Sequence, residues 1–166
     1  MIRRLQKADV DRVMDLWLDT NLKAHNFVHA AYWRSNFEPV KEMLPQAEVY
    51  VYESAGEIQG FVGLSGEYIE GIFVVDEMQS QGIGRRLLDH MKATKDTLYL
   101  SVYQKNTRAI RFYHIRTIFS HYNTDLQPST KTESDDAIEQ KFRDNREKCK
   151  EINLKMIQKK TKEHLL

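Results

Sequence analysis

The sequence has few of the residues that would cross-link the chain or anchor it in a membrane. Cys149 is the only cysteine among 166 residues, so the chain cannot form an internal disulfide or a metal site made of several cysteines. A single cysteine suits a reducing compartment, which leads us to expect a cytoplasmic protein. No apolar run has the length of a secretory leader or a membrane span, so we expect a soluble protein with no membrane partner.

An excess of charge of one sign is also absent. The chain has 25 lysines and arginines against 24 aspartates and glutamates, a net charge of +1. Proteins that hold nucleic acid by its phosphates usually carry a strong basic excess, so we expect no nucleic-acid partner. The hydrophobic content of 41% is ordinary for a globular domain of this length, which can bury one substantial core.

Short strands alternate with amphipathic helices along the first two thirds of the chain. We expect a strand over residues 1–6, a helix starting near Asp9 or Asp11, and a helical stretch over 28–44 that Pro39 breaks or kinks and Pro45 ends. Three β-rich runs joined by hairpin-length turns should follow, over residues 47–54, 57–66 and 67–75. The next elements expected are a helix, a strand and a short helix, over residues 85–94, 97–104 and 106–115.

This order indicates an α/β protein with a mixed (α+β) sheet, because three antiparallel strands lead into a β-α-β crossover. A sixth strand over residues 118–126 would complete the order β-α-α-β-β-β-α-β-α-β. We assign residues 1–127 to this domain and 128–166 to a polar linker with a charged helical tail. A thin apolar stripe in that tail, which includes Met156, fits either a solvated helix or a dimerisation element. The pattern leaves monomer and homodimer both open.

A glycine-rich stretch, QSQGIGRRLL, precedes the helix over 85–94. Gly82 and Gly84 allow either a plain tight turn or a cradle in which free N–H groups at the helix start bind an anion. Arg85 and Arg86 add positive charge there. The motif is not a P-loop, since no lysine followed by serine or threonine comes after the glycines. It is not the dinucleotide fingerprint either, because Leu87 stands where the third glycine belongs.

The stretch from Ile72 to Leu88 resembles the acetyl-CoA signature of the GNAT acetyltransferase superfamily. Its core, [Q/R]-x-x-G-x-[G/A], is met by Gln79, Gly82 and Gly84, although Asp76 replaces a frequent proline. A second family block, N-x-x-A-x-x-F-Y, is met by Asn106, Ala109, Phe112 and Tyr113. The resemblance covers roughly residues 1–120. It is strongest to small bacterial members with a W-x-x-x-x-x-x-x-H-x-F stretch, met here by Trp17, His25 and Phe27.

The resemblance implies the GNAT acyl-CoA N-acyltransferase fold and an acetyl-CoA-dependent N-acetyltransferase that releases CoA and uses no metal. Acetyl would pass directly to a primary amine, of a small molecule or of a lysine-containing peptide, since some similar proteins are described as peptide or protein lysine acetyltransferases. The implied cofactor-binding residues are Ile72, Phe73, Val74, Gln79, Ser80, Gln81, Gly82, Ile83, Gly84, Arg85, Asn106, Ala109 and Tyr113.

The resemblance also suggests catalytic and acceptor-binding residues. Tyr113 would protonate the leaving thiolate, although it also fits a core tyrosine. Glu70 is the preferred base and would lie with Glu67 on the fourth strand, but a solvated surface glutamate is an alternative. His25 is a second candidate base. With Tyr32 and Trp33, His25 could instead line the acceptor pocket, and core packing accounts equally well for the two aromatic residues.

The family pattern breaks after the second block. Thr117 and Ile118 stand where the family usually has a glycine and a phenylalanine, and a seventh strand is hard to find. This departure puts the substrate-side wall in doubt but leaves the upstream cofactor residues intact. It keeps open two alternatives: a CoA-binding or regulatory protein of this fold without turnover, and an interaction module that works through the tail.

Overall fold

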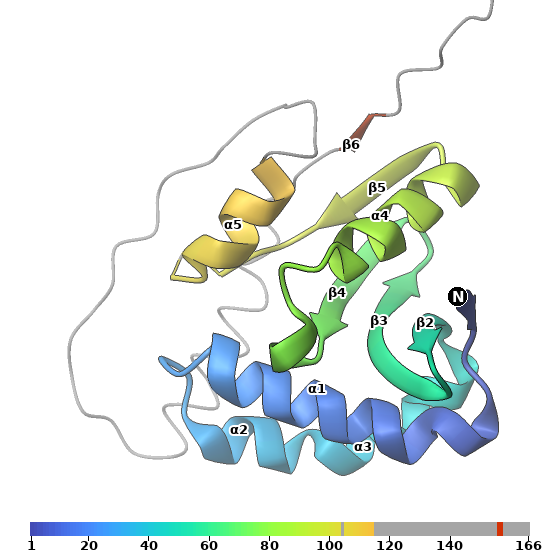
Figure 1. The fold of residues 1–166 in the computed structure, drawn as a ribbon. Coiled ribbons are helices and arrows are strands. Elements are labelled where there is room, and N and C mark those ends of the chain that lie inside the picture. Colours follow the sequence, from blue (N-terminus) through green and yellow to red (C-terminus); the bar gives the residue numbers. More distant parts are fainter. Residues whose placement is uncertain (104, 115–155, 158–166) are drawn as a thin grey trace, which may run out of the picture.

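The computed structural model describes residues 1–103, 105–114 and 156–157, and it forms one sheet with helices packed on both sides (Figure 1). The strands, in spatial order, are β1 (Ile2–Arg4), β2 (Glu48–Ser54), β3 (Glu57–Ser65), β4 (Tyr68–Val74), β5 (Thr97–Leu100) and β6 (Met156–Ile157). The helices are α1 (Val10–Ala24), α2 (Ala30–Ser35), α3 (Phe37–Met43), α4 (Ile83–Thr94) and α5 (Thr107–His114).

The expectation of a mixed sheet is confirmed. Strands β1 to β4 are antiparallel, and β4 pairs with β5 in parallel across the α4 crossover. Two-residue turns join β2 to β3 and β3 to β4, as the short spacings predicted. In the first turn Ala55 and Gly56 have φ of 52° and 79°, the left-handed values that let a tight hairpin follow the twist of its strands.

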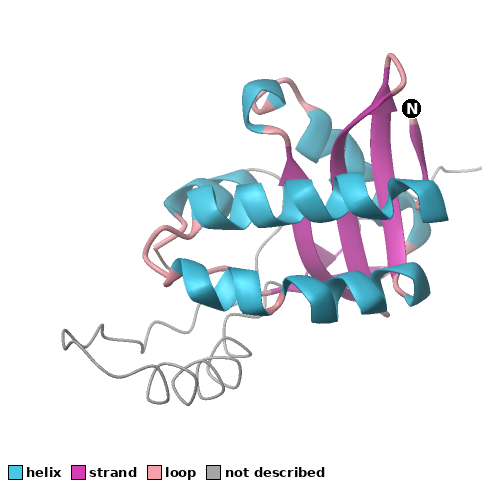
Figure 2. Cartoon of the chain, turned by 90° about the horizontal axis from the view of Figure 1, so that it is seen from below, coloured by secondary structure: helices cyan, strands magenta, loops and turns pink. Residues whose placement is uncertain are grey.

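Apolar side chains on the two faces of the sheet form two core clusters. Helix α1 contributes Val13, Met14 and Trp17 to one cluster, together with residues of α2 and α3, and these three helices cover the same face in Figure 2. Helix α4 packs on the other face through Ile83, Leu87, Leu88 and Met91. Neighbouring strand residues point to opposite faces, so Phe61 belongs to the first cluster and Val62 to the second. No helix in the described part of the chain is long and apolar enough to cross a membrane.

Strands β4 and β5 part soon after they begin to pair. Their register contains only Tyr68 with Tyr99 and Ile69 with Leu100. Next along β4 comes a bulge: Gly63 of β3 pairs with Gly71 and Leu64 pairs with Ile69, so Glu70 is the additional residue. A bulge bends its strand and increases the local twist. The strand predicted over 97–104 therefore ends early, at Leu100, because β4 has turned away.

The helical stretch predicted over 28–44 is two helices, and the break is at Asn36 rather than at Pro39. Pro39 lies in the first turn of α3, where its missing N–H would have no helical partner in any case. Val40 then makes the first helical bond, donating its N–H to the carbonyl oxygen of Asn36. Pro45 follows directly after α3 and its cap Leu44, as expected.

Most of the predicted C-terminal elements lie outside the described residues. These include the strand over 118–126 and nearly all of the helical tail, so the division into residues 1–127 and 128–166 stays a prediction. The exception is β6, whose residues Met156 and Ile157 pair antiparallel with Leu98 and Thr97 of β5. For these two residues the helical expectation is wrong, because the outer edge of β5 offers backbone groups that an extended segment can pair with.

An ionic cluster joins β1, β2 and the turn before α1. Arg3 donates hydrogen bonds to both carboxylate oxygens of Asp9, at 2.6 and 3.0 Å, and also to Glu53. Asp9, which is 8% exposed, accepts a further bond from the N–H of Gln6. The bonds from Arg3 are the main reason that the pKa of Asp9 lies below its usual value.

Replacing Arg3 with methionine should lower the free energy of unfolding at pH 7 by about 1–3 kcal/mol, because Asp9 would stay buried without its cation. A lowered pKa means that this stabilisation is present above the unfolded-state pKa of about 3.9 and is lost as the pH falls below it. Urea unfolding should therefore show a difference in the free energy of unfolding between wild type and Arg3→Met that becomes smaller as the pH falls from 7 toward 2. The neighbouring Arg4→Met serves as the control, and a gap that is the same at both pH values would contradict the assignment.

Candidate functional site

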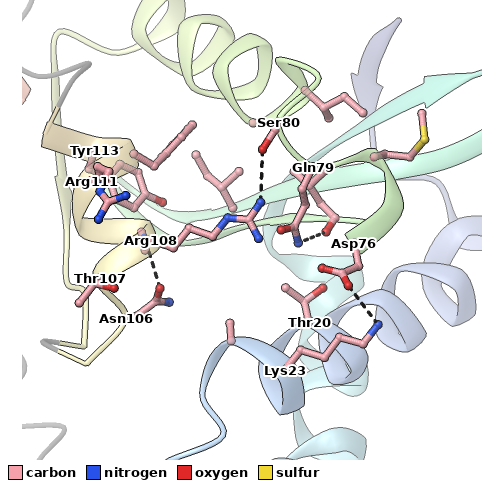
Figure 3. Close-up of a pocket in the computed structure, with 18 of the residues that line it drawn as sticks. Thr20, Lys23, Asp76, Gln79, Ser80, Asn106, Thr107, Arg108, Arg111 and Tyr113 are labelled. Carbon is pink, nitrogen blue, oxygen red and sulfur yellow. Dashed lines mark hydrogen bonds and ion pairs between the residues drawn. The ribbon is translucent and has the colours of Figure 1, made fainter.

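A cleft of about 820 Å³ opens where β4 and β5 have parted. Four elements line it: the C-terminal end of α1, the end of β4, the loop leading into α4, and α5. In Figure 3 Thr20 and Lys23 lie on one side, Asn106, Arg108 and Tyr113 on another, and Gln79 and Ser80, in the loop before α4, on a third. The cleft thus brings together the two sequence blocks that carry the family resemblance.

The glycine-rich loop places the start of α4 at the cleft. Ser80 and Gly82 adopt left-handed φ values of 64° and 84°, and α4 begins at Ile83. The first N–H groups of a helix have no intrahelical acceptor. Among the described residues, no backbone carbonyl outside the helix accepts a hydrogen bond from the N–H groups of Gly82 to Arg85. A Cβ on Gly82 would meet no heavy atom within 4 Å, so protein does not fill the space beside it. The loop has the donors and the open space that an anion requires.

The side chain of Gln79 supports this loop from within. It lines the cleft but donates a hydrogen bond of 3.0 Å back to the carbonyl oxygen of Val74, at the end of β4. Its amide therefore ties the loop to the strand, and the loop's backbone remains available to a ligand. Gln81, also predicted to bind cofactor, is not among the cleft residues and donates to the carbonyl oxygen of Glu77.

The cleft is positively charged. Its lining has five cationic and two anionic side chains, an excess of three positive charges: Lys23, Arg85, Lys105, Arg108 and Arg111 against Asp19 and Asp76. Lys23 pairs with both aspartates, and Arg108 reaches across to the hydroxyl of Ser80 at 3.4 Å (Figure 3). Arg86 lies elsewhere: it donates to the hydroxyl of Tyr52 on β2, so of the two arginines only Arg85 lines the cleft.

Helix α5 supplies the fourth wall through residues that the second sequence block predicted. The Oδ1 atom of Asn106 accepts the N–H of Ala109 at 3.0 Å, which caps the first turn of the helix. Tyr113 lines the cleft and is only 6% exposed. Burial raises the pKa of its phenol well above the usual value, so Tyr113 remains protonated across the physiological range.

Strand β4 contributes one face to the cleft. Ile72 and Val74 line it, whereas Phe73 points to the opposite face and stacks on Phe61 with ring centroids 4.6 Å apart. Glu70 is exposed at the bulge and is not among the residues of this cleft. Glu67, expected on the same strand, lies instead in the turn before it.

The three residues predicted to contact the acceptor lie together, outside this cleft. His25 stacks on Trp33 at 5.3 Å, and Tyr32 packs edge-on against Trp33 at 5.0 Å. Trp33 is 7% exposed and belongs to the core cluster under α1. Burial lowers the pKa of His25 to about 4, which keeps its imidazole neutral. A contact with the acceptor stays a prediction for all three.

Sequence reasoning missed most of the charged lining. Arg108 and Arg111 sit inside the second block and are three apart, so both project from one side of α5. That spacing was the available signal for them. Lys23 gave no signal of its own, because it reaches the cleft only through the packing of α1 beside β4.

Comparison with known proteins agrees with this arrangement. Residues 45–114 match the model of the acetyltransferase (GNAT) domain. The chain is 35% identical over 115 residues to peptidyl-lysine N-acetyltransferase YiaC of Escherichia coli, covering 68% of this chain and 79% of that protein. It is 30% identical to peptidyl-lysine N-acetyltransferase YjaB of Salmonella typhimurium over 113 residues, with 68% and 78% of the two chains covered.

Solved structures of acetyltransferases have a similar fold. The solution structure of apo YjaB from Escherichia coli is 26% identical, with a TM-score of 0.62, and the match covers 69% of this chain and 78% of that one. The PaiA N-acetyltransferase of Thermoplasma acidophilum, solved in complex with coenzyme A, is 18% identical with a TM-score of 0.66, covering 75% and 92%. The chain therefore belongs to the GNAT acetyltransferase family and is an N-acetyltransferase.

Proposed function

We propose that the protein transfers an acetyl group from acetyl-CoA to a primary amine, and that the amine is a lysine side chain of a peptide or protein. The observation that carries the proposal is the cleft itself, where the open N–H groups before α4, a surplus of positive charge and the buried Tyr113 face one space. The names of the YiaC and YjaB relatives support a peptidyl-lysine acceptor, with a small-molecule amine as the alternative.

The residues present fit coenzyme A. Its diphosphate suits the N–H groups of Gly82 to Arg85, where the helix dipole also favours negative charge. Arg85 and Arg108 both line the cleft, where Arg108 reaches Ser80 of that loop, and both can neutralise phosphate oxygens. When bound, acetyl-CoA supplies an acetyl thioester, the activated form of the group that is transferred.

Strand β4 is suited to hold an extended arm of the ligand. In an antiparallel pair, alternate residues direct their N–H and C=O groups toward the partner, and the others direct theirs away from it. Beyond Ile69 the far side of β4 no longer faces β5, so backbone groups between Glu70 and Val74 can pair with an extended ligand as with another strand. N–H groups on this edge can also stabilise negative charge on a carbonyl oxygen.

Two side chains are proposed to move protons. Tyr113 holds its proton because burial raises the phenol's pKa, and it can donate that proton to the thiolate leaving group. Glu70 stands exposed at the bulge, on the strand that leads into the cleft, and can accept a proton from the incoming ammonium group directly or through water. These two roles, one acid and one base, complete direct transfer to an amine.

Binding can be tested by replacing Arg108 with glutamine. Losing one charge beside the glycine loop should raise the Kd for CoA roughly three- to tenfold and weaken its dependence on salt. Arg86→Gln is the matched control, because Arg86 lies against Tyr52 outside the cleft and its loss should leave the Kd unchanged. Isothermal titration measures both; absence of CoA binding to the wild type would overturn the proposed function.

The acid can be tested with Tyr113→Phe. Removing one hydroxyl should lower kcat roughly 100-fold in a thiol-release assay with acetyl-CoA and a lysine-containing peptide, with a much smaller change in the Kd for CoA. Tyr99→Phe, on β5 and outside the cleft, should leave kcat close to wild type. Equal kcat values for wild type and Tyr113→Phe would show that the phenol of Tyr113 is not the acid that protonates the thiolate.

The base can be tested with Glu70→Gln, which should lower kcat/KM at pH 7 roughly 10- to 100-fold. The difference in kcat/KM between wild type and Glu70→Gln should become smaller near pH 10, because a large share of lysine amines, with a pKa of about 10.4, is then already deprotonated in solution. Glu67→Gln in the adjoining turn is the control and should behave as wild type at both pH values. A deficit that does not change with pH would argue against proton transfer by Glu70.

A further inference from the structure

His25 makes two hydrogen bonds that join elements on different sides of the cleft. It caps the C-terminal end of α1, and its Nδ1 lies 3.0 Å from Oδ1 of Asn21 on that helix. Its Nε2 lies 3.1 Å from Nδ2 of Asn106, the residue that caps α5. Helix α1 packs on one face of the sheet and α5 joins the cluster on the other, so the imidazole links the two layers.

Both amides are held in one orientation by the backbone. Asn21 donates from Nδ2 to the carbonyl oxygen of Trp17 at 2.9 Å, which leaves its oxygen to face His25. Asn106 accepts the N–H of Ala109 on its oxygen, which leaves its NH₂ group to face Nε2. An amide oxygen only accepts and an NH₂ group only donates, so Nδ1 must carry the proton and Nε2 must accept. One form of the imidazole satisfies all four bonds: neutral, protonated on Nδ1.

The surroundings of the ring favour the same form. Trp33 stacks on it with an interplanar angle of 25°, and the rings of Phe27 and Tyr103 contact it at 5.7 and 4.9 Å. The side-chain amides of Asn21 and Asn106 are the hydrogen-bond partners of its two ring nitrogens, and among the described residues Tyr103 brings a phenol into ring contact. The ammonium group of Lys105 lies over the ring of Phe27, 5.7 Å from its centroid, and so brings a positive charge to this aromatic group. Protonation would turn Nε2 into a second donor facing the donor of Asn106.

We propose that neutral His25 is a positioning residue for CoA binding: it fixes Asn106 and the first turn of α5 relative to the end of α1. The inference rests on the proposed function, because α1 and α5 bear on catalysis only as walls of a CoA cleft. Through these bonds the imidazole sets the width of the cleft between Lys23 and Arg108. The residue that sequence analysis assigned to the acceptor would then act on the donor side.

The first experiment reads the hydrogen-bond pattern by NMR, independently of any activity. The ¹⁵N and ¹³C chemical shifts of the His25 ring should be those of the neutral Nδ1–H tautomer in the wild type at neutral pH. Asn106→Asp keeps an oxygen to cap α5 but turns an acceptor toward Nε2, so His25 should become doubly protonated and titrate at a clearly higher pH. An Nε2–H tautomer in the wild type, or an unchanged His25 titration in folded Asn106→Asp, would overturn the proposal.

The second experiment reads CoA binding. His25→Phe keeps an aromatic ring against Trp33 but removes both nitrogens, and it should raise the Kd for CoA roughly 3- to 30-fold, the range seen for residues that couple structural elements. His29→Phe, an exposed neighbour, is the control and should bind as wild type. Measurements are made below the unfolding temperature of each variant, so that stability alone does not change the Kd.

The outcomes separate the two proposals. If the wild type binds CoA and His25→Phe binds it equally well with a lower Tm, His25 is only structural and the positioning role is wrong. If the wild type binds no CoA, the proposed function fails and the positioning role fails with it. A raised Kd for CoA in His25→Phe, together with the Nδ1–H tautomer in the wild type, supports the inference.

Discussion

The divergence of β4 from β5 is the constraint on which the rest of the site depends. Two parallel strands that stayed paired would satisfy each other's backbone groups and leave no room for a ligand between them. Here the extra residue at Glu70 bends β4 after two pairs, and β5 ends at Leu100. The cleft is lined by Ile72 and Val74, which lie beyond the last β4–β5 pair, and the exposed carboxylate is that of the additional residue itself.

The parted strands are held by what packs on each side of them. Helix α4 starts beside the end of β4 and buries Leu87, Leu88 and Met91 against the sheet, so its N-terminus is fixed at the cleft. Gln79 closes the same loop onto the strand through Val74. The charged residues around this frame are mostly exposed and contribute little to folding, which leaves them available for recognition.

Local patterns in the sequence predicted the fold well where they were strong. The periodic apolar residues of α1 and α4 and the short hairpin turns gave the right elements, and the two spaced motifs placed Gly82, Asn106 and Tyr113 around one cavity. The early end of β5 was missed because it depends on the bulge in a different strand. The hydrogen bond between His25 and Asn106 was missed for a similar reason: the two residues are 81 positions apart, and only the tertiary packing brings them together.

The cleft has a consequence for the lifetime of the protein. Its walls come from α1, β4, α4 and α5, elements that belong to both core clusters, so any ligand that contacts all four bridges the two layers of the fold. Binding to the native state alone adds to the free energy of unfolding, by about 1.4 kcal/mol for each tenfold rise of ligand above its Kd. Resistance to proteolysis should therefore follow the supply of the ligand, and a cell that is short of it would also lose the protein faster.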